Sequence, residues 1–332
     1  MTWFDRVPKV ELHLHLEGAI PHAALWQLVR KYGGDPSLRT LEDLEKRFAF
    51  RDFPHFLDTW AWKNGFLREY EDFRFIAEAI ARKLSAQNIR YVEAFYSPPD
   101  FAHHGLETQR LTEAIRDGLG QVPHLEIMLI ADVVRDYGPQ QAMTTLQQIM
   151  EVRDLGVIGI GLGGAEHEHP PELFRRVFRA AREAGLRTTA HAGEGAGAES
   201  VRGAIEDLQV DRVGHGVRSY EDEGLLDRLV KLQIPLEMCP LSNIRTGVVA
   251  SISEHPIRSY FERGVLVTVN TDDPEMFGNC LAQEFELLEQ ELGFTRKETQ
   301  QLILNGIASS WLAKDRKLTM RQDFQGDPAW AD

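Results

Sequence analysis

Short β-rich runs that alternate with helical segments are the feature that most constrains the fold of this chain. Eight such runs occur, at residues 10–16, 89–96, 125–131, 157–162, 187–191, 212–215, 234–238 and 265–270. Eight parallel strands joined by helices are typical of a (β/α)8 barrel of the TIM type. A doubly wound open sheet is the alternative, but no GxGxxG motif follows a strand, and the glycine-rich stretch 193–197 lacks that spacing. The sequence therefore predicts an α/β fold with a single (β/α)8 barrel.

Apolar residues at helical spacing fill most of the segments between these runs. They occur at residues 108–119, 140–154, 171–184, 198–208, 223–231 and 256–263. Extra helices are predicted after the first strand, within residues 21–85, and at the C-terminus, over residues 281–292 and 297–311. No linker, low-complexity stretch or run of charge divides the chain. We therefore expect one barrel domain over residues 1–332.

Composition argues against several classes of function. The formal net charge is −14, whereas nucleic-acid binding takes clustered Lys and Arg, which we do not find. No apolar run is long enough to span a bilayer and the N-terminus has no signal-peptide pattern, so we expect a cytoplasmic protein without a membrane partner. The two cysteines, Cys239 and Cys280, form no CxxC pair, so His and carboxylates would hold any metal. Composition leaves open whether the chain forms a homo-oligomer.

The first predicted strand carries two histidines at alternate positions. His13 and His15 are separated by Leu14, with Leu12 and Leu16 outside them, so both imidazoles lie on one face and the leucines on the other. A buried strand that happens to contain two histidines is the simpler interpretation. It leaves several ring nitrogens without partners in a dry environment, however. The pair therefore favours half of a metal site.

Histidines and acids gather where four of the eight predicted strands end. They are His13, His15, His191, Glu194, His215, Asp272 and Asp273. Barrel enzymes collect their catalytic groups at the C-terminal ends of the strands. Three histidines and an aspartate are ligands that zinc accepts, and zinc lowers the pKa of its water ligand to about 7, so we expect hydrolytic chemistry. Glycines flank His215, which would let its ring approach that water as a base or electrostatic partner.

Five short motifs occur in a fixed order along the chain. They are His13-Leu14-His15-Leu16-Glu17-Gly18, His191-Ala192-Gly193-Glu194, Gly214-His215-Gly216, Cys239-Pro240-Leu241-Ser242-Asn243 and Asn270-Thr271-Asp272-Asp273-Pro274. Together they resemble the adenosine deaminase family of the amidohydrolase superfamily, over residues 8–312. The resemblance implies a barrel with one zinc ion per chain that hydrolytically replaces the 6-amino group of a small-molecule purine by oxygen and releases ammonia.

The resemblance also implies roles for individual residues. It implies that His13, His15, His191 and Asp272 bind zinc. Glu194 would protonate ring nitrogen 1, His215 would orient or deprotonate the water, and Asp273 would hold the water and ring nitrogen 7. Substrate contacts are implied for His15, Glu17, Asp273, the backbone N–H of Gly164 at ring nitrogen 3, and Phe56 and Trp60 in an aromatic lid. Residues 53–62, which contain these two rings, fit equally a helix packed on the core.

Two departures from the family pattern concern the substrate rather than the metal. Glu17 stands where typical adenosine deaminases have an aspartate that meets the ribose 5′-hydroxyl, and residues 161–164 replace their Asp-Leu-Ala-Gly. Adenine deaminases share the His-x-His-x-Glu-Gly motif, whereas Gly214 and residues 236–239 look more like nucleoside deaminases; aminodeoxyfutalosine deaminases are a third alternative. We predict an adenosine-type nucleoside. A nucleoside monophosphate is disfavoured because its phosphate would meet Glu17 without a basic cluster nearby.

Two rival classes fit the sequence less well. Binuclear amidohydrolases typically carry a carboxylated lysine at the end of the fourth strand, where residues 161–164 contain no lysine. A catalytically inert, nucleoside-binding barrel would be expected to have lost a metal ligand or Glu194, and none is missing. The sequence therefore predicts a zinc-dependent purine nucleoside aminohydrolase.

Overall fold

The computed structural model describes residues 1–50 and 53–331, and its core is an eight-stranded parallel barrel. The strands follow one another around the sheet in the order of the sequence. Their bounds are β1 Lys9–His15, β2 Ile89–Tyr96, β3 Glu126–Asp132, β4 Val157–Gly161, β5 Arg187–Ala192, β6 Arg212–His215, β7 Leu236–Met238 and β8 Val267–Val269. All eight predicted strands are confirmed, and so is the (β/α)8 fold.

The barrel is closed by a short contact between its first strand and the segment after its last. The His15 N–H donates to the Asp272 carbonyl over 2.9 Å, and the Asp272 N–H donates to the His13 carbonyl over 3.0 Å. Asp272 adopts a φ of 65°, a left-handed conformation that is uncommon for a residue with a side chain. The backbone that completes the barrel therefore also brings an aspartate beside two histidines.

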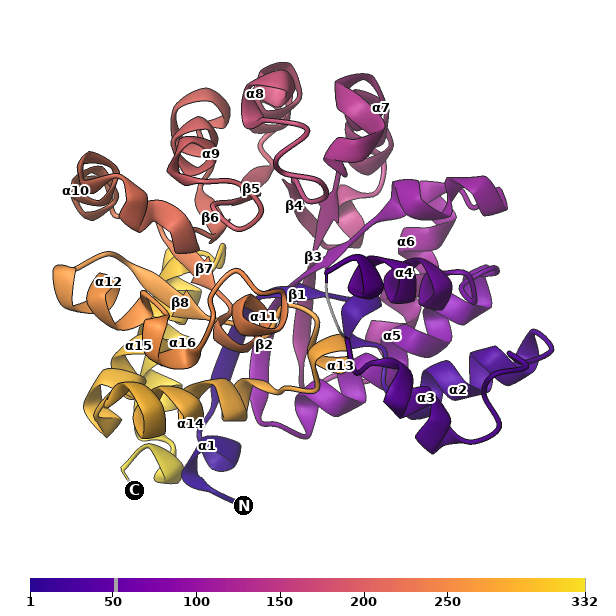
Figure 1. Cartoon of the computed structure of the whole chain (residues 1–332), viewed down its shortest axis with the longest axis horizontal. Helices are drawn as coiled ribbons and strands as arrows, with labels where there is room; N and C mark the ends of the chain where they lie inside the picture. Colours follow the sequence, from indigo (N-terminus) through magenta and orange to yellow (C-terminus); the bar gives the residue numbers. More distant parts are fainter. Residues whose placement is uncertain (51–52, 332) are drawn as a thin grey trace.

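Helices surround the strands, as Figure 1 shows. They are α1 Trp3–Arg6, α2 His22–Lys31, α3 Leu41–Arg47, α4 Phe53–Asn64, α5 Tyr70–Ser85, α6 Thr108–Leu119, α7 Gly138–Met150, α8 Arg175–Glu183, α9 Ala198–Gly203, α10 Glu223–Leu232, α11 Pro240–Arg245, α12 Ile257–Arg263, α13 Pro274–Phe277, α14 Leu281–Leu292, α15 Arg296–Ser309 and α16 Lys314–Gly326. Extra helices follow β1 and β8, as the sequence predicts. Across residues 1–50 and 53–331, no helix combines the length and the apolar character needed to cross a membrane.

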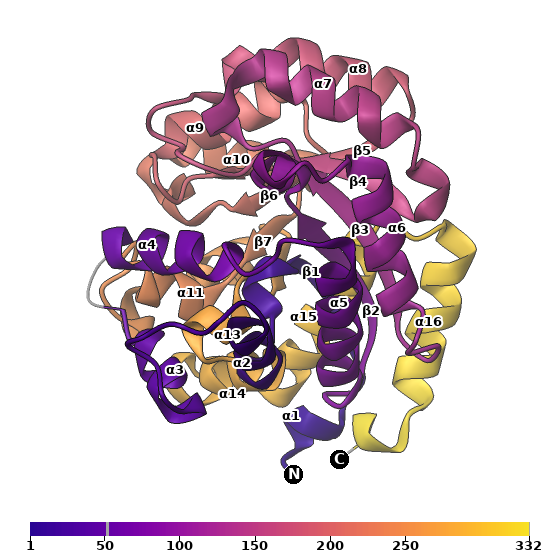
Figure 2. The same ribbon diagram turned by 90° about the vertical axis from the view of Figure 1, so that its right-hand side faces the viewer.

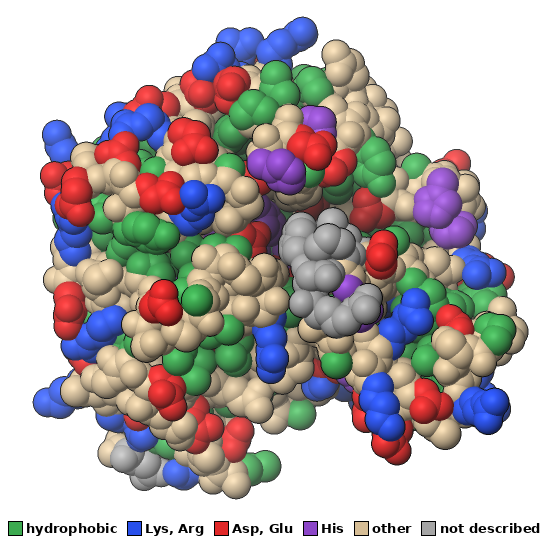
Figure 3. All heavy atoms as spheres, in the orientation of Figure 1, with side chains coloured by type: hydrophobic (Ala, Val, Ile, Leu, Met, Phe, Trp, Pro, Cys, Tyr) green, Lys and Arg blue, Asp and Glu red, His purple; other side chains and the backbone are tan. Residues whose placement is uncertain are grey.

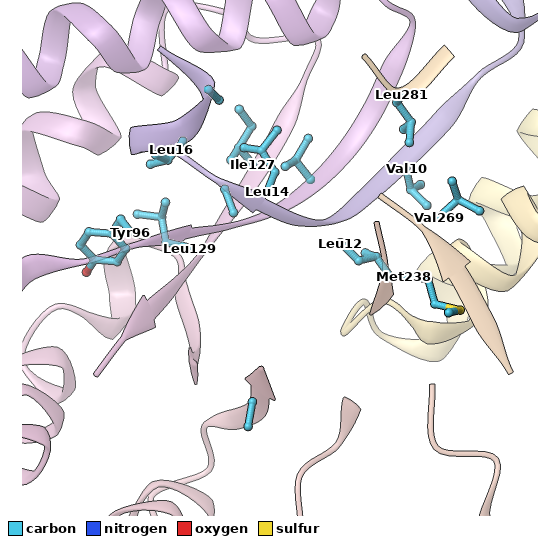
Figure 4. Close-up of a cluster of buried hydrophobic side chains, with 14 of the residues drawn as sticks. Val10, Leu12, Leu14, Leu16, Tyr96, Ile127, Leu129, Met238, Val269 and Leu281 are labelled. Atoms are coloured by element: carbon cyan, nitrogen blue, oxygen red, sulfur yellow. The ribbon is translucent and has the colours of Figure 1, made fainter. Parts of the chain in front are cut away.

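The two faces of β1 have opposite chemistry. Figure 4 shows Val10, Leu12, Leu14 and Leu16 among apolar side chains from neighbouring strands and helices. The intervening residues, which include His13 and His15, belong to the other face and are buried inside the barrel. The alternation read from the sequence is therefore the alternation between the helix layer and the barrel interior.

Four helices were not predicted, and the first of them, α1, has only four residues before β1. The short helices α11 and α13 each begin with a proline directly after a site segment, and they are too short to display an apolar period. Helix α16 is mostly exposed and only Phe324 of it is buried, so it lacks the apolar stripe on which the prediction depended. The two chain ends meet, because the Trp3 indole N–H donates to the Ala329 carbonyl over 2.6 Å, and both termini lie at one end of the molecule (Figure 2).

Candidate active site

Metal-type donor atoms converge inside the barrel at the C-terminal ends of the strands. His191 Nε2 lies 3.1 Å from His13 Nε2 and 3.1 Å from His15 Nε2. Asp272 Oδ1 lies 3.4 Å and 3.3 Å from the same two nitrogens of His13 and His15. Figure 3 looks onto this face of the molecule, where histidine and acidic side chains are visible in the recess at its centre. The structure thus brings together all four residues that the sequence predicts as ligands.

His215 lies in the same cluster. Donor atoms of His13, His191, His215 and Asp272 all fall within 4.8 Å of one another, so distance alone admits His215 as a ligand in place of His15. Contacts distinguish the two, because His215 Nδ1 accepts a 3.2 Å hydrogen bond from the Asn243 amide and His215 Nε2 faces Glu194 Oε2 at 3.4 Å. The candidate metal site therefore contains His13, His191 and Asp272, with His15 and His215 as the two further histidines beside them.

The electrostatics of this cluster suit a cation. Burial and the neighbouring imidazoles hold the pKa of His191 well below its usual range. Burial also acts to lower the pKa of His15, but the nearby carboxylates of Asp273 and Asp272 outweigh it and raise that pKa to about 10. Buried oxygens on both aspartates, Asp272 Oδ1 and Asp273 Oδ1, make no hydrogen bond with the described residues. A divalent cation would satisfy this N3O donor set, which is the chemistry zinc accepts.

Polar partners behind the ligands fix their orientation. His13 Nδ1 lies 2.8 Å from Glu237 Oε2, and the Ser242 hydroxyl donates to Asp272 Oδ2 over 2.7 Å. Glu237 in turn accepts from the Arg212 guanidinium, which also donates to Glu93 across the barrel. These groups are fully buried, so each charge is compensated where water is excluded. The sequence analysis assigned no role to Arg212 or Glu237. Each is a charged residue within an otherwise apolar predicted strand, and that pattern could have indicated a buried ion pair.

His215 is held by a chain of hydrogen bonds behind it. His255 Nε2 lies 3.2 Å from Asn243 Oδ1, and Asn243 contacts His215 Nδ1. Burial lowers the pKa of His215 to about 3. A side chain at Gly214 would place its Cβ 2.9 Å from His13 Cε1, so glycine is needed there because His13 packs against it.

Glu194 follows β5 and points toward His215. Its side chain is 21% exposed, and burial raises its pKa well above the usual range, with further increases from the charges of Asp272, Glu166 and Asp273. A carboxyl with a raised pKa can keep a proton at neutral pH. Glu194 is therefore a carboxyl group that can act as a proton donor at this position.

Asp273 lies on the other side of the cluster, against Gly18. A Cβ at Gly18 would fall 1.7 Å from Asp273 Oδ1, so only glycine leaves room for this carboxylate. Burial and the charge of Asp272 raise the pKa of Asp273 to about 7. Both neighbouring aspartates thus reach the site, because β8 ends at Val269 and the chain turns at Asp272.

Glu17 is buried beside a buried lysine. Its Oε1 accepts the Ser97 N–H over 3.0 Å, while its Oε2 has no hydrogen-bond partner among the described residues. Lys63 of α4 donates to the Glu17 carbonyl over 2.6 Å and to Asn64 Oδ1 over 2.7 Å. Burial raises the pKa of Glu17 and lowers that of Lys63 to about 8. Lys63 is a site residue that the sequence analysis missed, since nothing in a helix sequence indicates which lysine becomes buried.

The aromatic residues of α4 take two different positions. The Trp60 ring lies edge-on to His15 with a centroid distance of 6.4 Å and covers the Lys63 ammonium at 4.1 Å. Phe56 instead stacks on Phe277 of α13 at 5.3 Å. Gly164 lies on the loop after β4 and is exposed; a Cβ there would fall 1.9 Å from Asp136 Oδ2. Trp60 is therefore beside the candidate metal site, whereas Gly164 is an exposed residue next to Asp136.

A (β/α)8 barrel with His, Asp and Glu at its strand ends fits a metal-dependent hydrolase, and amidohydrolases are one such class. The model of the family described as adenosine deaminase matches residues 8–325, so the chain belongs to the adenosine deaminase family and is a deaminase-type hydrolase. It is 38% identical over 309 residues to an adenine deaminase of Bordetella parapertussis, covering 92% of this chain and 97% of that protein.

Solved structures agree with this assignment. The adenine deaminase from Arthrobacter aurescens is 32% identical with a TM-score of 0.91, covering 96% of this chain and 98% of its own. An amidohydrolase from Burkhoderia ambifaria that contains bound zinc is 30% identical with a TM-score of 0.90, covering 99% and 94%. The predicted family is confirmed, and two of these relatives are named as adenine deaminases.

Proposed function

We propose that this chain hydrolyses the C6–N bond of free adenine, releasing ammonia and hypoxanthine, with one zinc ion bound by His13, His15, His191 and Asp272. The observation that carries this substrate is the buried Oε2 of Glu17, which has no hydrogen-bond partner among the described residues. Adenine has an N–H on its five-membered ring that a carboxylate can accept, whereas a nucleoside has a glycosidic bond there. Relatives named as adenine deaminases support the same substrate.

The proposed roles follow from where each side chain lies. Glu194, at the end of β5, donates a proton to ring nitrogen 1, which makes C6 electrophilic. Zinc, when bound, supplies a water molecule acidic enough to lose its proton near neutral pH. His215, which lies 3.4 Å from Glu194 Oε2, orients that water, and Asp273 holds the water and ring nitrogen 7. The Trp60 ring, next to His15, and Phe56 cover the flat base.

An adenosine-type nucleoside is the second candidate. The sequence analysis predicts it because Gly214 and residues 236–239 are similar to those of nucleoside deaminases. Against a nucleotide, burial and the charge of Glu17 raise the pKa of nearby Asp100 to about 7, which indicates an acidic environment rather than a phosphate site. Discrimination by one hydrogen-bonding position is commonly large, so Glu17 is the residue on which this choice depends.

A comparison of specificity constants tests the proposal. Purified, zinc-analysed protein is assayed for ammonia release from adenine, adenosine, adenosine monophosphate and aminodeoxyfutalosine, on wild type and on Glu17→Asp. We expect adenine to exceed every nucleoside by at least about tenfold, and Glu17→Asp to shrink that ratio. A higher specificity constant for adenosine on the wild type would replace adenine by the nucleoside, and no ammonia from any purine would contradict deamination itself.

A further inference from the structure

A buried carboxylate holds the loop on which Glu194 stands. Glu166, on the segment after β4, is only 5% exposed. Its Oε1 accepts the Gly193 N–H over 2.6 Å, and its Oε2 accepts the N–H groups of Glu194 over 3.1 Å and of Gly195 over 2.7 Å. Three consecutive main-chain donors thus point at one side chain from another part of the barrel.

This arrangement answers a structural need of the loop. Residues 193–195 follow the last residue of β5 and have no sheet partner for these N–H groups, and an unpaired buried donor is costly. Gly193 has a φ of 74°, and a Cβ there would fall 2.5 Å from Val201 Cγ2, so the chain turns tightly just before Glu194. Successive N–H groups in such a turn form a concave site for an anion. The Glu166 carboxylate occupies it and fixes the direction of the turn.

The nearest metal ligand has a separate anchor. Arg135 donates from Nη2 to the His191 carbonyl over 2.7 Å and from Nη1 to the His169 carbonyl over 2.7 Å. His191 itself is the fifth residue of β5, within the sheet. Loss of the Glu166 contacts therefore loosens Glu194 while β5 and Arg135 still hold His191 in place.

We propose that Glu166 is a positioning residue for catalysis, which acts by seating the main chain of residues 193–195 so that the Glu194 carboxyl meets the substrate. The proposal rests on the proton-donor role given to Glu194 under the proposed function. Among the described residues, the Glu166 carboxylate accepts hydrogen bonds only from the N–H groups of residues 193–195, and its charge also contributes to the raised pKa of Glu194. A displacement of about 1 Å of a reacting group can lower turnover by about 100-fold, so a loop contact of this kind is sufficient to matter.

A matched control exists at the opposite end of the same strand. Asp211 Oδ2 accepts the Thr188 N–H over 2.8 Å near the start of β5, away from the site. Asp211 and Glu166 therefore both accept hydrogen bonds from main-chain N–H groups, but only Glu166 does so beside Glu194. If Glu166 contributed only to stability, substitution of Glu166 and substitution of Asp211 would have equivalent effects on kcat.

The experiment measures kcat, KM, bound zinc and thermal stability for Glu166→Ala, Glu166→Gln and Asp211→Ala. We expect both Glu166 variants to retain zinc and lose roughly 10–100-fold in kcat with a smaller change in KM. Asp211→Ala should keep at least a third of the wild-type kcat, even if its Tm falls by as much as the Tm of the Glu166 variants. Glu166→Gln, which keeps the side-chain volume, serves as the folded variant if alanine destabilises the chain.

Rescue by a small carboxylate separates positioning from general damage. Glu166→Ala removes a group about the size of acetate, so added acetate or formate should raise its kcat in a saturable way and leave Asp211→Ala unchanged. A kcat within threefold of wild type in both Glu166 variants overturns the proposal. So does a loss of turnover that parallels the loss of zinc or of folded protein, or the failure of both anions to rescue folded, zinc-loaded Glu166→Ala.

Failure of the proposed function would look different. If Glu194→Gln kept near-normal turnover, the proton-donor role would be wrong whatever Glu166 does. If Glu194→Gln is inactive while the Glu166 variants are fully active, only the positioning role is wrong. In the double variant Glu166→Ala/Glu194→Gln, we expect no loss beyond that of Glu194→Gln, because residues that act as a unit are non-additive.

Discussion

The two sides of the candidate site are built in different ways. The metal wall, made of His13, His15, His191 and Asp272, stands on or directly after strands β1, β5 and β8. The side that we call the substrate wall, made of Glu17, Gly18, Lys63 and Asp273, comes from helix α4, from the 3-10 helix Glu17–Ala19 after β1 and from the segment after β8.

Geometry on the metal wall is set by the sheet, because parallel strands keep neighbouring backbones about 4.8 Å apart. Geometry on the substrate wall is set by single contacts, such as the Lys63 bond to the Glu17 carbonyl and the close approach of Asp273 to Gly18. Under the proposed function, the barrel strands place the metal-binding groups, while a few contacts between the segments after β1, α4 and β8 place the groups that select the substrate.

The largest effect should come from breaking the metal wall. His191→Ala removes a nitrogen that lies 3.1 Å from both His13 Nε2 and His15 Nε2, so zinc and turnover should be lost together. Metal analysis and ammonia release measure the two quantities. Exposed His124 is the matched control, and His124→Ala should retain both. Full zinc occupancy in His191→Ala would contradict the ligand set, and two metals per wild-type chain would favour a binuclear enzyme.

The next largest effect should come from Glu194, which lies between the metal wall and the substrate wall. Glu194→Gln should keep zinc and still bind a purine. Its kcat should fall by more than the roughly 10²–10⁴-fold typical of one acid–base step, because ring protonation is what activates C6. Exposed Glu168 provides the control Glu168→Gln, which should be neutral. A loss confined to KM would show that Glu194 only binds the substrate.

A smaller loss is expected from crowding the substrate wall. Gly18→Ala would place a Cβ 1.7 Å from Asp273 Oδ1, so the carboxylate must move away from its position. We expect kcat/KM to fall by about 100-fold, with zinc retained, since a shift of about 1 Å in a reacting group costs about that much. Gly326→Ala on α16, where a Cβ meets nothing within 4 Å, should leave activity unchanged. Unchanged kcat/KM in Gly18→Ala would remove Asp273 from the substrate wall.

The smallest effect should come from releasing α4 from the substrate wall. Lys63→Met keeps the length of the side chain but leaves the Glu17 carbonyl and Asn64 Oδ1 without a donor. We expect KM to rise by roughly tenfold, equivalent to about 1.4 kcal/mol, with kcat and zinc nearly unchanged. Lys46, which is exposed and pairs with Glu42, supplies the control Lys46→Met. A fall in kcat larger than the rise in KM would place Lys63 in the chemistry rather than in binding.

Much of the metal wall could be predicted from the sequence. His13 and His15 alternate with leucines, and a strand has a period of two, so their common face follows from the chain alone. His191 and Asp272 follow apolar runs whose strand character was also predicted, and barrel topology brings such strand ends together. The partners behind them were not predicted, because Arg212 on β6 meets Glu237 on the neighbouring strand β7 and Glu93 on β2 across the barrel.

The substrate wall depends on contacts that no local pattern contains. Glu17, Gly18 and Asp273 were named from the sequence, but the Glu17 carboxyl is held by the Ser97 N–H, 80 residues away. The main-chain carbonyl of Glu17 is held by Lys63, 46 residues away. Glu166 likewise meets residues 193–195 only because β4 and β5 are neighbours in the sheet.

The sequence by itself determined the eight strands, the family and the residues that can bind a metal, because alternation and short motifs are local properties of the chain. Only the tertiary structure decided that Asp272 closes the barrel and that Lys63 is buried against Glu17. It also decided that one Glu17 oxygen has no hydrogen-bond partner in residues 1–50 and 53–331. These features arise where distant segments pack together, and the free energy of burying a charge depends on its neighbours in space rather than on its neighbours in the chain.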